Sequence, residues 1–339
     1  MSQKQQHKKH HKKHHKSKRE QIILAVLLLA VVFSLAVAFF LIEKLIDKAS
    51  GLGDELGYSD AKKSWVMYED QWYSRKEDVK SILIMGIDSI ETPDESRAYS
   101  SQADFLALLV IDVKNESFRV LHLNRDTMTD ITQLDAYGRE YGVFNAQLAL
   151  AHTYGGEDRI RCRNTVDAVE NLLYGVSVNH FLSLTMDTVS ILNDSIGGVT
   201  VELDEDFPAL GESAKKGTSL TLKGDQALTF VRWRGNEGEK SNLNRMARQR
   251  QYISGIFDKY TEKDPDDTLE TMMKVNKYLV SDCTVNQLAS LIEKLQDYTF
   301  EGTLTLAGEA VLGDEFVEYY IDETAAQETV LELFYVPEE

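Results

Sequence analysis

Cysteine and proline are scarce in this sequence: the 339 residues include two cysteines and four prolines. Two cysteines are too few for a disulfide framework, so a small disulfide-stabilised scaffold is excluded. Two outcomes stay open for Cys162 and Cys283, a single bond between them or two buried free thiols. No internal repeat and no long linker rich in proline or glycine interrupts the chain, which favours one large domain after the N-terminal segments.

Several familiar catalytic patterns are also missing. The sequence contains no G-x-S-x-G, no H-E-x-x-H and no Walker phosphate loop, which argues against serine-hydrolase, zinc-protease and P-loop chemistry. Outside the N-terminal tail the histidines are scattered, at His122, His152 and His180. Because His122 alternates with apolar residues in a strand-like run, we expect a core histidine there rather than a metal ligand.

Positive charge is a minority over most of the chain. The first 20 residues hold eight Lys or Arg, five His and one acid, and residues 21–42 hold no charge. The remainder therefore carries 29 Lys or Arg against 54 Asp or Glu, a formal balance of −25. A domain this acidic binds nucleic acid poorly, so no nucleic-acid partner is expected. Residues 1–20 indicate a basic cytoplasmic tail near anionic lipid rather than a histidine metal site.

Residues 21–42 are almost wholly apolar. The 21 residues Ile22–Ile42 would span about 31 Å as a helix, enough to cross a bilayer. Basic residues before this run favour an N-terminus on the inner side, and no small-residue cleavage pattern follows it. We therefore predict a retained transmembrane signal anchor: a single-pass protein of the cell membrane with its N-terminus cytoplasmic and its C-terminal domain extracellular.

The segments after the predicted span are an extracytoplasmic stem, residues 43–80, and a main domain, residues 81–337. The run "WVMYEDQWYS" reads as a hairpin packed on that domain. Continuous apolar runs such as "ILIMGID", "DFLALLVIDV" and "FRVLHL" are typical of buried strands. Helical patterns occur at Asn145–Thr153, at Asn164–Leu173 and in the C-terminal part. Alternating strands and helices predict an α/β fold, a three-layer α-β-α sandwich with a mixed central sheet.

The stretch "VRWRGNEGEKSNLNRMARQR" concentrates arginine in this acidic domain. Arg232 and Arg234 lie two apart in a β-like run, and Arg245 and Arg248 lie three apart in a helical pattern, so each pair shares a face. If strand and helix fold together, four guanidinium groups converge, and such a cluster fits the oxygens of a pyrophosphate. The alternative is a solvated basic strand and helix, each paired with local acids.

Polar residues also lie at the ends of predicted strands, where open α/β sheets bind ligands. Asp104 precedes "FLALLVIDV", and Arg125 and Asp126 follow "FRVLHL". Two carboxylates and several arginines suit a pyrophosphate held together with Mg²⁺, because carboxylates bind the hard cation and arginines bind the phosphate oxygens. Taken singly, these residues are also typical of a turn acid and a surface ion pair.

Together, these motifs resemble the LytR-CpsA-Psr family of cell-wall ligases. The resemblance runs from about Ser81 through the arginine-containing helix and more weakly to the C-terminal "YYID" and "LELFY". It rests on the order and spacing of "ILIMGIDS", "ADFLALLVID", "LNRDT", "FNAQLALAHTYGG", "SIGGVTVEL", "LKGDQALTFVRWR" and "NRMARQR".

The resemblance implies a membrane-anchored transferase that moves a glycopolymer from a polyprenyl pyrophosphate carrier to peptidoglycan. It implies that the lipid tail lies in an apolar tunnel within the α/β core, and that Asp104 and Asp126 lie beside Mg²⁺ (or Mn²⁺). Asp104 is our candidate for the general base, and Arg125 is expected at the catalytic site with both acids. The residues that the resemblance assigns to pyrophosphate binding are Arg232, Arg234, Arg245, Arg248, Gln249 and Asn145.

Three positions depart from the family pattern. Gln102 and Val143 stand where an arginine and a lysine are usual, and Asn242 stands where an aspartate is frequent. A hydrogen bond from arginine to phosphate is worth about 1.5–3 kcal/mol, so losing one predicts binding weaker by about ten- to a hundredfold. Two alternatives follow: a polyprenyl pyrophosphate hydrolase on the same scaffold, or a non-catalytic regulatory or lipid-binding protein of the cell wall.

Overall fold

The computed structural model describes residues 65–88, 102–234, 241–260 and 265–338, which belong to one compact unit. The predicted basic tail, the predicted membrane span and most of the predicted stem lie outside the described residues. Within the described ranges, no helix combines the length and the hydropathy needed to cross a bilayer.

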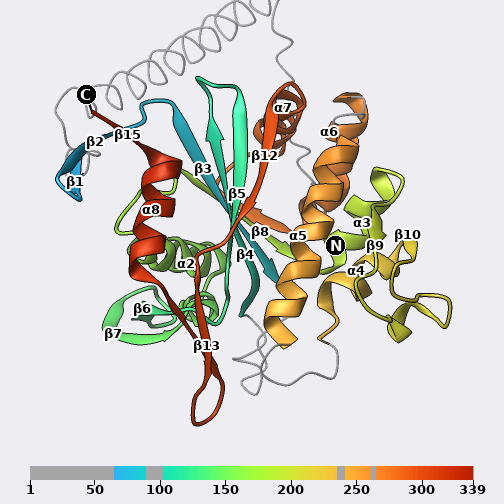
Figure 1. Ribbon diagram of the computed structural model, residues 1–339, viewed down its shortest axis with the longest axis horizontal. Coiled ribbons are helices and arrows are strands. Elements are labelled where there is room, and N and C mark those ends of the chain that lie inside the picture. Colours follow the sequence, from blue (N-terminus) through green and yellow to red (C-terminus); the bar gives the residue numbers. More distant parts are fainter. Residues whose placement is uncertain (1–64, 89–101, 235–240, 261–264, 339) are drawn as a thin grey trace, which may run out of the picture. The chain divides into compact units, whose positions relative to one another are not determined.

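A six-stranded mixed sheet forms the centre of the unit (Figure 1). Strands β3 and β8 are parallel, as are β5 and β12, whereas the β11–β8, β3–β4 and β4–β5 pairs are antiparallel. In the order in which they lie across the sheet, the strands are β11 (Leu279–Ser281), β8 (His180–Thr185), β3 (Val79–Ile87), β4 (Ala103–Asp112), β5 (Ser117–Leu123) and β12 (Thr299–Leu304).

Helices cover both faces of this sheet. Figure 1 shows α2 (Asp158–Leu172) and α8 (Glu323–Phe334) on one side. On the other side lie α5 (Ser241–Tyr260), α6 (Pro265–Val275) and α7 (Val285–Leu295). The α/β fold with a mixed sheet between helices is therefore confirmed. Because both faces are covered, the central strands β3 and β4 are apolar over most of their length and show no regular alternation with polar residues.

The side chains of β4 divide between two cores. Leu106, Leu108 and Val110 pack toward α2 and α8, and Ala107 and Leu109 point to the opposite face, toward α5 and α7. Successive side chains of a strand point to opposite faces, so one apolar run supplies both layers. Residues such as Leu106 and Leu108 are fully buried, and each contributes about 1.5–3 kcal/mol through removal of its side chain from water.

A smaller lobe extends from the helical layer. It contains α3 (Asp187–Ser195), β9 (Thr200–Glu202), a short 3-10 helix η3 (Pro208–Leu210), β10 (Ser219–Thr221) and α4 (Asp225–Arg232), around a core that includes Phe207 and Phe230. The turn from α3 to β9 uses Gly197 and Gly198, both with positive φ, a conformation that glycine adopts without steric cost. A Cβ at Gly198 would lie 2.4 Å from the carbonyl oxygen of Leu222, so no other residue fits there.

Three small sheets complete the unit. The predicted hairpin at "WVMYEDQWYS" is confirmed as β1 (Trp65–Tyr68) and β2 (Gln71–Arg75), and β2 pairs with the C-terminal β15 (Tyr335–Pro337). Two further hairpins are β6 (Met128–Leu134) with β7 (Glu140–Gln147), and β13 (Gly308–Leu312) with β14 (Val317–Ile321). Tyr319 of β14 donates its amide N–H to the Asp126 carbonyl, which attaches the last hairpin to the main sheet's edge.

The predicted strand at "FVRWR" is wrong. Residues Asp225–Arg232 form helix α4, and its buried residues Ala227, Phe230 and Val231 recur at helical spacing. The β-branched and aromatic residues suggested a strand, but burial against the small lobe at spacings of three and four selects the helix. Arg232 is the last helical residue and Arg234 follows two residues later, so the arginines leave from a helix end rather than from a strand face.

The helix predicted at Asn145–Thr153 is also wrong in its first part. Asn145 belongs to β7, opposite Asp130 of β6, and residues Leu148–Thr153 form a 3-10 helix, η2. The next helix, α2, begins at Asp158 rather than at Asn164. Its first turn carries charged residues on the solvent side, which hid the helical period. Another 3-10 helix, η4 (Asn276–Tyr278), separates α6 from β11.

Both cysteines are free thiols in the structure. Cys162 is fully buried on α2, and Cys283 lies in the turn between β11 and α7. Of the two outcomes that the sequence left open, the structure has two free thiols, one buried and one partly exposed.

His122 on β5 is a core histidine, as its alternation with apolar residues predicted. It is 1% exposed, and its ring lies 5.0 Å from that of Phe105. Burial, together with the charges of the nearby Arg250 and Arg245, lowers the pKa of His122 from 6.5 to about 3. Its Nδ1 atom has no hydrogen-bond partner among the described residues. His122 is therefore neutral at physiological pH.

We predict that His122 makes the unit less stable as pH falls below 6.5. The unfolded chain binds a proton near pH 6.5, whereas the folded chain binds one only near pH 3. The free energy of unfolding should therefore lose about 1.4 kcal/mol per pH unit from this residue over that interval. Denaturant unfolding between pH 7 and 4.5 should show a shallower pH dependence in His122→Leu than in the unmodified chain. Equal slopes would contradict the assignment.

Candidate functional site

One edge of the central sheet collects the acidic residues of the candidate site. The end of β3 and the start of β4 are opposite each other, with Ile87 paired to Ala103, and β5 ends at the same edge. Asp88 therefore follows β3, Asp104 is the second residue of β4, and Asp126 comes shortly after β5. The topology brings together three carboxylates from separate parts of the sequence.

Arg125 lies between two of these carboxylates. Its Nη1 forms an ion pair with Asp104 Oδ1, and its Nε lies 3.3 Å from Asp126 Oδ1. Its Nη2 donates to Gln102 Oε1, so the glutamine at the first departure from the family pattern contacts this arginine directly. Burial lowers the pKa of Arg125, while the Asp126 carboxylate opposes that effect. Arg125 thus contacts both Asp104 and Asp126.

The arginines after α4 reach the same carboxylates from the other side. Arg234 Nη2 lies 3.9 Å from Asp104 Oδ1, and Arg232 Nη2 lies 2.9 Å from Asp88 Oδ1. Both arginine side chains are about half exposed, at 47% for Arg232 and 60% for Arg234. Their guanidinium groups are therefore accessible to a ligand from solvent.

Helix α5 supplies a third component, in which Asn242 links a cation to a carboxylate. Asn242 Nδ2 donates to Asp126 Oδ2 at 2.6 Å and to Asn124 Oδ1 at 2.8 Å. Its Oδ1 accepts a hydrogen bond from Arg245 Nη2 at 2.7 Å. Asn124 Oδ1 also accepts a hydrogen bond from the Asp126 amide N–H. The third departure from the family pattern is therefore part of the network that holds Arg245.

The cluster has an excess of positive charge at its centre. Burial lowers the pKa of Arg245 to about 10, and repulsion from Arg234 and Arg125 contributes. Burial also raises the pKa of Asp126, against the effect of Arg125 and Arg245. The Nε atom of Arg245 is buried and has no hydrogen-bond partner among the described residues. Three mutually repelling guanidinium groups, one with an unused donor, are a site for an anion with several oxygens.

Arg248, one turn after Arg245, has different partners. Its Nη1 lies 3.0 Å from Glu205 Oε1, its Nη2 donates to the Trp233 carbonyl, and its guanidinium lies over the rings of Phe207 and Trp233. These contacts attach α5 to the small lobe. The expected role of Arg248 in binding pyrophosphate stays a prediction.

The remaining two predicted ligands lie on either side of the cluster. Gln249 is buried, and its Nε2 donates to the Val231 carbonyl at 3.1 Å, next to Arg232. Asn145 is exposed on the β6–β7 hairpin, where its Nδ2 donates to Asp130 Oδ1 at 3.1 Å. Val143, the second departure from the family pattern, is 56% exposed on the same hairpin. The structure joins neither Asn145 nor Val143 to the arginines by a hydrogen bond or an ion pair among the described residues.

An apolar cavity of about 610 Å³ lies within the described unit, between the central sheet and the helices α3, α5, α6 and α7. Its size is in the range of pockets that enclose organic ligands. Apolar side chains line it almost throughout, among them Ile84, Phe105, Ala107, Leu182, Ile253 and Leu291. The sheet therefore has a filled core on its α2 and α8 face and a hollow one on the opposite face.

One end of this cavity adjoins the charged cluster. Residues that line the cavity are the direct neighbours of cluster residues: Phe105 follows Asp104, and Val231 precedes Arg232. Gly86, two residues before Asp88, also lines it, and a Cβ there would lie 2.9 Å from the Cβ of Phe105. The arrangement suits an amphipathic ligand with an anionic group at the arginines and an apolar chain in the cavity.

The carboxylates fit a hard cation that is shared with a ligand. Asp104 Oδ1 and Asp88 Oδ1 are buried and accept no hydrogen bond from the described residues, although each has an ion-pair contact with an arginine. No three acidic, histidine or cysteine residues of this cluster have ligand atoms within 4.8 Å of one another in the described ranges. Mg²⁺ is often held by one or two carboxylates together with substrate phosphates, so Asp104 and Asp126 fit that mode.

Three residues of this site were not identified as site residues from the sequence. Asp88 ends "ILIMGID", so the rule that pointed to Asp126, a polar residue after a buried strand, also applies to it. Asn124 and Asn242 carry no charge, and no spacing rule marks an amide that connects two charged groups across the fold. Asn242 was noted from the sequence only as a departure from the family pattern, and its role as a link between charged groups became recognisable when β5 and α5 were seen together.

Comparisons with known proteins find relatives in sequence and in fold. TagU of Halalkalibacterium halodurans, a polyisoprenyl-teichoic acid–peptidoglycan teichoic acid transferase, is 32% identical over 181 residues, 53% of each chain. The chain thus spans about half the length of the curated relatives it matches. The crystal structure of B. subtilis TagV superimposes with a TM-score of 0.60 at 22% identity, covering 76% of this chain and 97% of that one. TagT bound to LI-WTA gives 0.56 at 20% identity, covering 76% and 90%.

A family model extends the likeness over most of the sequence. The model described as the LytR_cpsA_psr family matches residues 47–333, which include every strand of the central sheet and all of the arginine and carboxylate residues of the cluster. The chain belongs to the LytR_cpsA_psr family.

Proposed function

We propose that this protein transfers a glycopolymer from a polyprenyl pyrophosphate carrier to peptidoglycan in cell-wall assembly. The observation that carries the proposal is the junction of an apolar cavity with a cluster of buried arginines. A polyprenyl pyrophosphate has the matching chemistry, with a long apolar chain joined to an anion that has several oxygens. The names of the TagU relatives, which are teichoic acid transferases, support the same reaction class.

The arginines would bind the pyrophosphate and neutralise charge as the reaction proceeds. Arg125, Arg234 and Arg245 lower one another's affinity for protons, and an anion between them relieves that repulsion. Transfer of a phosphoryl group needs mainly positioning and charge stabilisation. Arg232 and Arg234, as the more exposed members, would contact the ligand first, and the buried Arg245 would hold the inner phosphate.

In the proposed reaction, a hydroxyl oxygen of the acceptor forms a bond to the phosphorus that carries the glycan. The bond between that phosphorus and the bridging oxygen breaks, and polyprenyl phosphate leaves. We assign Asp104 to accept the hydroxyl proton, because its carboxylate lies between Arg125 and Arg234, in the cluster that would bind the pyrophosphate. Arg125 positions this carboxylate through its ion pair.

Asp104 and Asp126 are the residues that we propose to hold Mg²⁺ (or Mn²⁺) together with the pyrophosphate. The ion, when bound, would neutralise part of the charge on the pyrophosphate oxygens. Gln147 Nε2 lies 3.2 Å from Asp126 Oδ1 and also donates to the Val317 carbonyl, so it holds this carboxylate in place.

The substrate also fits the location that the sequence predicts. A single membrane span at residues 21–42 would hold the domain at the outer surface of the cell membrane, where a lipid-linked glycan and peptidoglycan are both within reach. The formal net charge of −25 after residue 42 would disfavour binding to nucleic acid.

We predict that Arg234→Gln lowers release of polyprenyl phosphate by about ten- to a hundredfold, because one charge-assisted hydrogen bond to phosphate is lost. The assay uses the full chain in detergent, a lipid-linked glycan, Mg²⁺ and peptidoglycan oligosaccharides. Arg139→Gln is the matched control, since Arg139 is similarly exposed and pairs with Asp135 on the β6–β7 hairpin. Release at the same rate without oligosaccharide would indicate hydrolysis instead, and binding without release would indicate a regulatory protein.

We predict that Asp104→Asn lowers turnover by at least about a hundredfold, the usual contribution of a general base, and leaves binding of the carrier lipid, measured without Mg²⁺, within about threefold. The arginines that would bind the pyrophosphate stay in place, whereas the proton acceptor is lost. Single-turnover transfer and equilibrium binding would be measured on the same preparation, with Asp206→Asn, an exposed carboxylate paired with Lys215, as the control. Unchanged turnover would rule out Asp104 as the proton acceptor.

We predict that Ala107→Phe reduces the affinity for long-chain carriers by at least about tenfold, because the aromatic ring would occupy space in the cavity that the apolar chain of the carrier needs. Ala107 is 1% exposed on β4 and lines the cavity. Affinity for a soluble analogue with a very short chain should change little, because the arginine cluster is intact. Thermal unfolding checks that the added ring has not disrupted the core. Equal losses for both ligands would show that the cavity does not hold the chain.

A further inference from the structure

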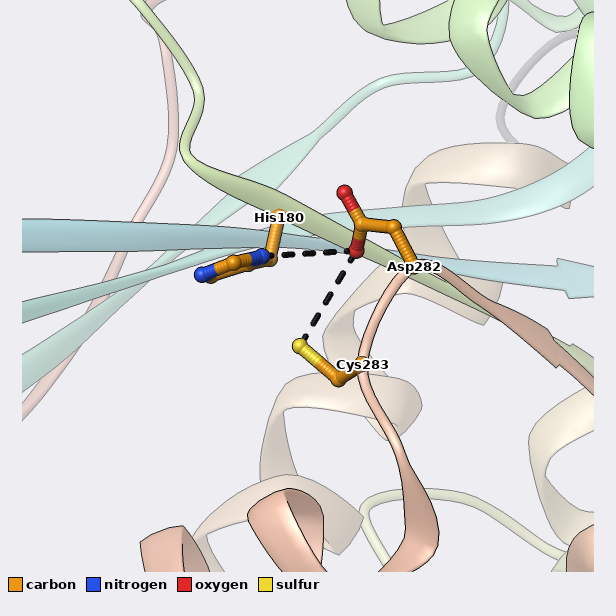
Figure 2. A group of neighbouring side chains, drawn as sticks. All are labelled: His180, Asp282 and Cys283. Atoms are coloured by element: carbon orange, nitrogen blue, oxygen red, sulfur yellow. Dashed lines mark hydrogen bonds and ion pairs between the residues drawn. The ribbon is translucent and has the colours of Figure 1, made fainter. Parts of the chain in front are cut away.

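A second group of side chains with metal-binding chemistry lies at the other end of the sheet. His180 is the first residue of β8, and Asp282 and Cys283 follow β11, the edge strand paired with β8. In Figure 2, the imidazole of His180 and the thiol of Cys283 both point toward one oxygen of Asp282. Among the described residues, these three are the ones whose nitrogen, oxygen and sulfur atoms lie within 4.8 Å of one another.

The distances are close to those between ligands of one small metal ion. His180 Nδ1 lies 3.5 Å from Asp282 Oδ1, and Cys283 Sγ lies 3.9 Å from the same oxygen. Ligands about 2.0–2.3 Å from a tetrahedral zinc ion are separated from one another by roughly 3.3–3.8 Å. Both distances are within a few tenths of an ångström of that range, and all three ligand atoms lie within 4.8 Å of one another.

Backbone contacts hold this group in place before any ion arrives. The Phe181 amide N–H donates to Asp282 Oδ1 at 3.0 Å, and Ser281 Oγ donates to the Phe181 carbonyl at 2.6 Å. The Cys283 amide N–H in turn donates to Ser281 Oγ at 3.0 Å. Residues next to His180 thus position both of the other side chains, and little conformational entropy is left to lose on binding.

Arg163 of α2 positions the carboxylate from behind. Its Nη2 lies 3.4 Å from Asp282 Oδ2, the oxygen that does not face His180 and Cys283. A second contact of this kind is common at metal sites, where it orients the ligand. With the thiol deprotonated, the aspartate and the thiolate carry two negative charges against one positive charge on Arg163, so the group keeps a net attraction for a dication.

We propose that His180 Nδ1, Asp282 Oδ1 and Cys283 Sγ bind one divalent transition-metal ion of the zinc class. An imidazole, a carboxylate and a thiolate are borderline or soft ligands that suit Zn²⁺ and Co²⁺ rather than Mg²⁺. The Cys283 proton leaves to solvent as the metal–sulfur bond forms. His180 is about half exposed, so water fills the fourth position.

This site is separate from the arginine cluster. Strand β8 runs parallel to β3, with His180 opposite Ile82 and Thr185 opposite Ile87, the residue before Asp88. The two groups therefore lie at opposite ends of the same strands, and the metal site does not depend on the proposed transferase activity. An ion there would connect β8, the edge strand β11 and the turn into α7, so it would stabilise an edge of the sheet.

The test is a cobalt titration of the full chain in detergent, followed by visible and near-ultraviolet absorption. The five histidines of the first 20 residues also offer imidazole nitrogens to added Co²⁺, so total binding is not informative. Those residues contain no cysteine, and a thiolate-to-cobalt charge-transfer band therefore reports a cysteine ligand alone. We expect the intensity of this band to correspond to one bound thiolate per chain, together with the d–d absorption of a tetrahedral site. Addition of Zn²⁺ should abolish the band.

Two cysteine variants make the assignment specific. Cys283→Ser should remove the band, and Cys162→Ala should keep it, because Cys162 is fully buried beside His152. His180→Gln should lower the cobalt affinity measured by the band at least about tenfold, since loss of a residue that merely orients a ligand already costs about 10- to 100-fold. Absence of the band in the unmodified chain, or its survival in Cys283→Ser, would overturn the proposal.

A second measurement does not depend on the spectrum. Zn²⁺ that binds only the folded chain should raise the midpoint of thermal unfolding as its concentration rises. The rise should be present in Cys162→Ala and absent in Cys283→Ser, with metal-free midpoints showing that both variants fold. An equal rise in all three proteins would place the binding in the N-terminal histidines and would contradict the site.

Discussion

The burial of like charges at one edge of the sheet is the constraint on which the rest of this structure depends. Arg125 and Arg245 are largely removed from water, and each repels the other and Arg234. Breaking a buried ion pair by removing one partner typically costs about 3–5 kcal/mol. The fold avoids that cost with carboxylates from three separate parts of the sequence, which the antiparallel β3–β4 and β4–β5 pairings bring to one place. The site and the sheet topology therefore specify each other.

The same sheet explains why a cavity can exist in a stable unit. Its α2 and α8 face is filled by closely packed aliphatic residues, and this face carries most of the buried apolar surface. The opposite face can then remain hollow beneath α5, α6 and α7 without loss of the fold. His122 lies at the junction of the cavity and the arginine cluster, with its ring against Phe105 on the cavity side. The charges of the nearby Arg245 and Arg250 disfavour its protonation. A neutral imidazole there adds no further positive charge to the cluster.

Much of the fold could be predicted from the sequence, because the buried strands are long apolar runs and the α6, α7 and α8 helices have clear helical periods. Short segments were harder. "FVRWR" has the composition of a strand, but the packing of Phe230 and Val231 in the core of the small lobe places them in a helix. The charged residues of the site were predicted individually. Their pairing was not, since Arg234 meets Asp104, and Arg248 meets Glu205, only through tertiary structure.

The departures from the family pattern change the charge of the site without removing its connections. Gln102 accepts a hydrogen bond from Arg125, and Asn242 donates to Asp126 while it accepts from Arg245. An aspartate in place of Asn242 would lie within hydrogen-bond distance of the Asp126 carboxylate, and two carboxylates that close repel unless a cation or a proton lies between them. The amide removes that repulsion and leaves Arg245 less neutralised, which strengthens its attraction for an anion. Gln102 lacks the charge of an arginine, so the two substitutions partly compensate in the field that a pyrophosphate would meet.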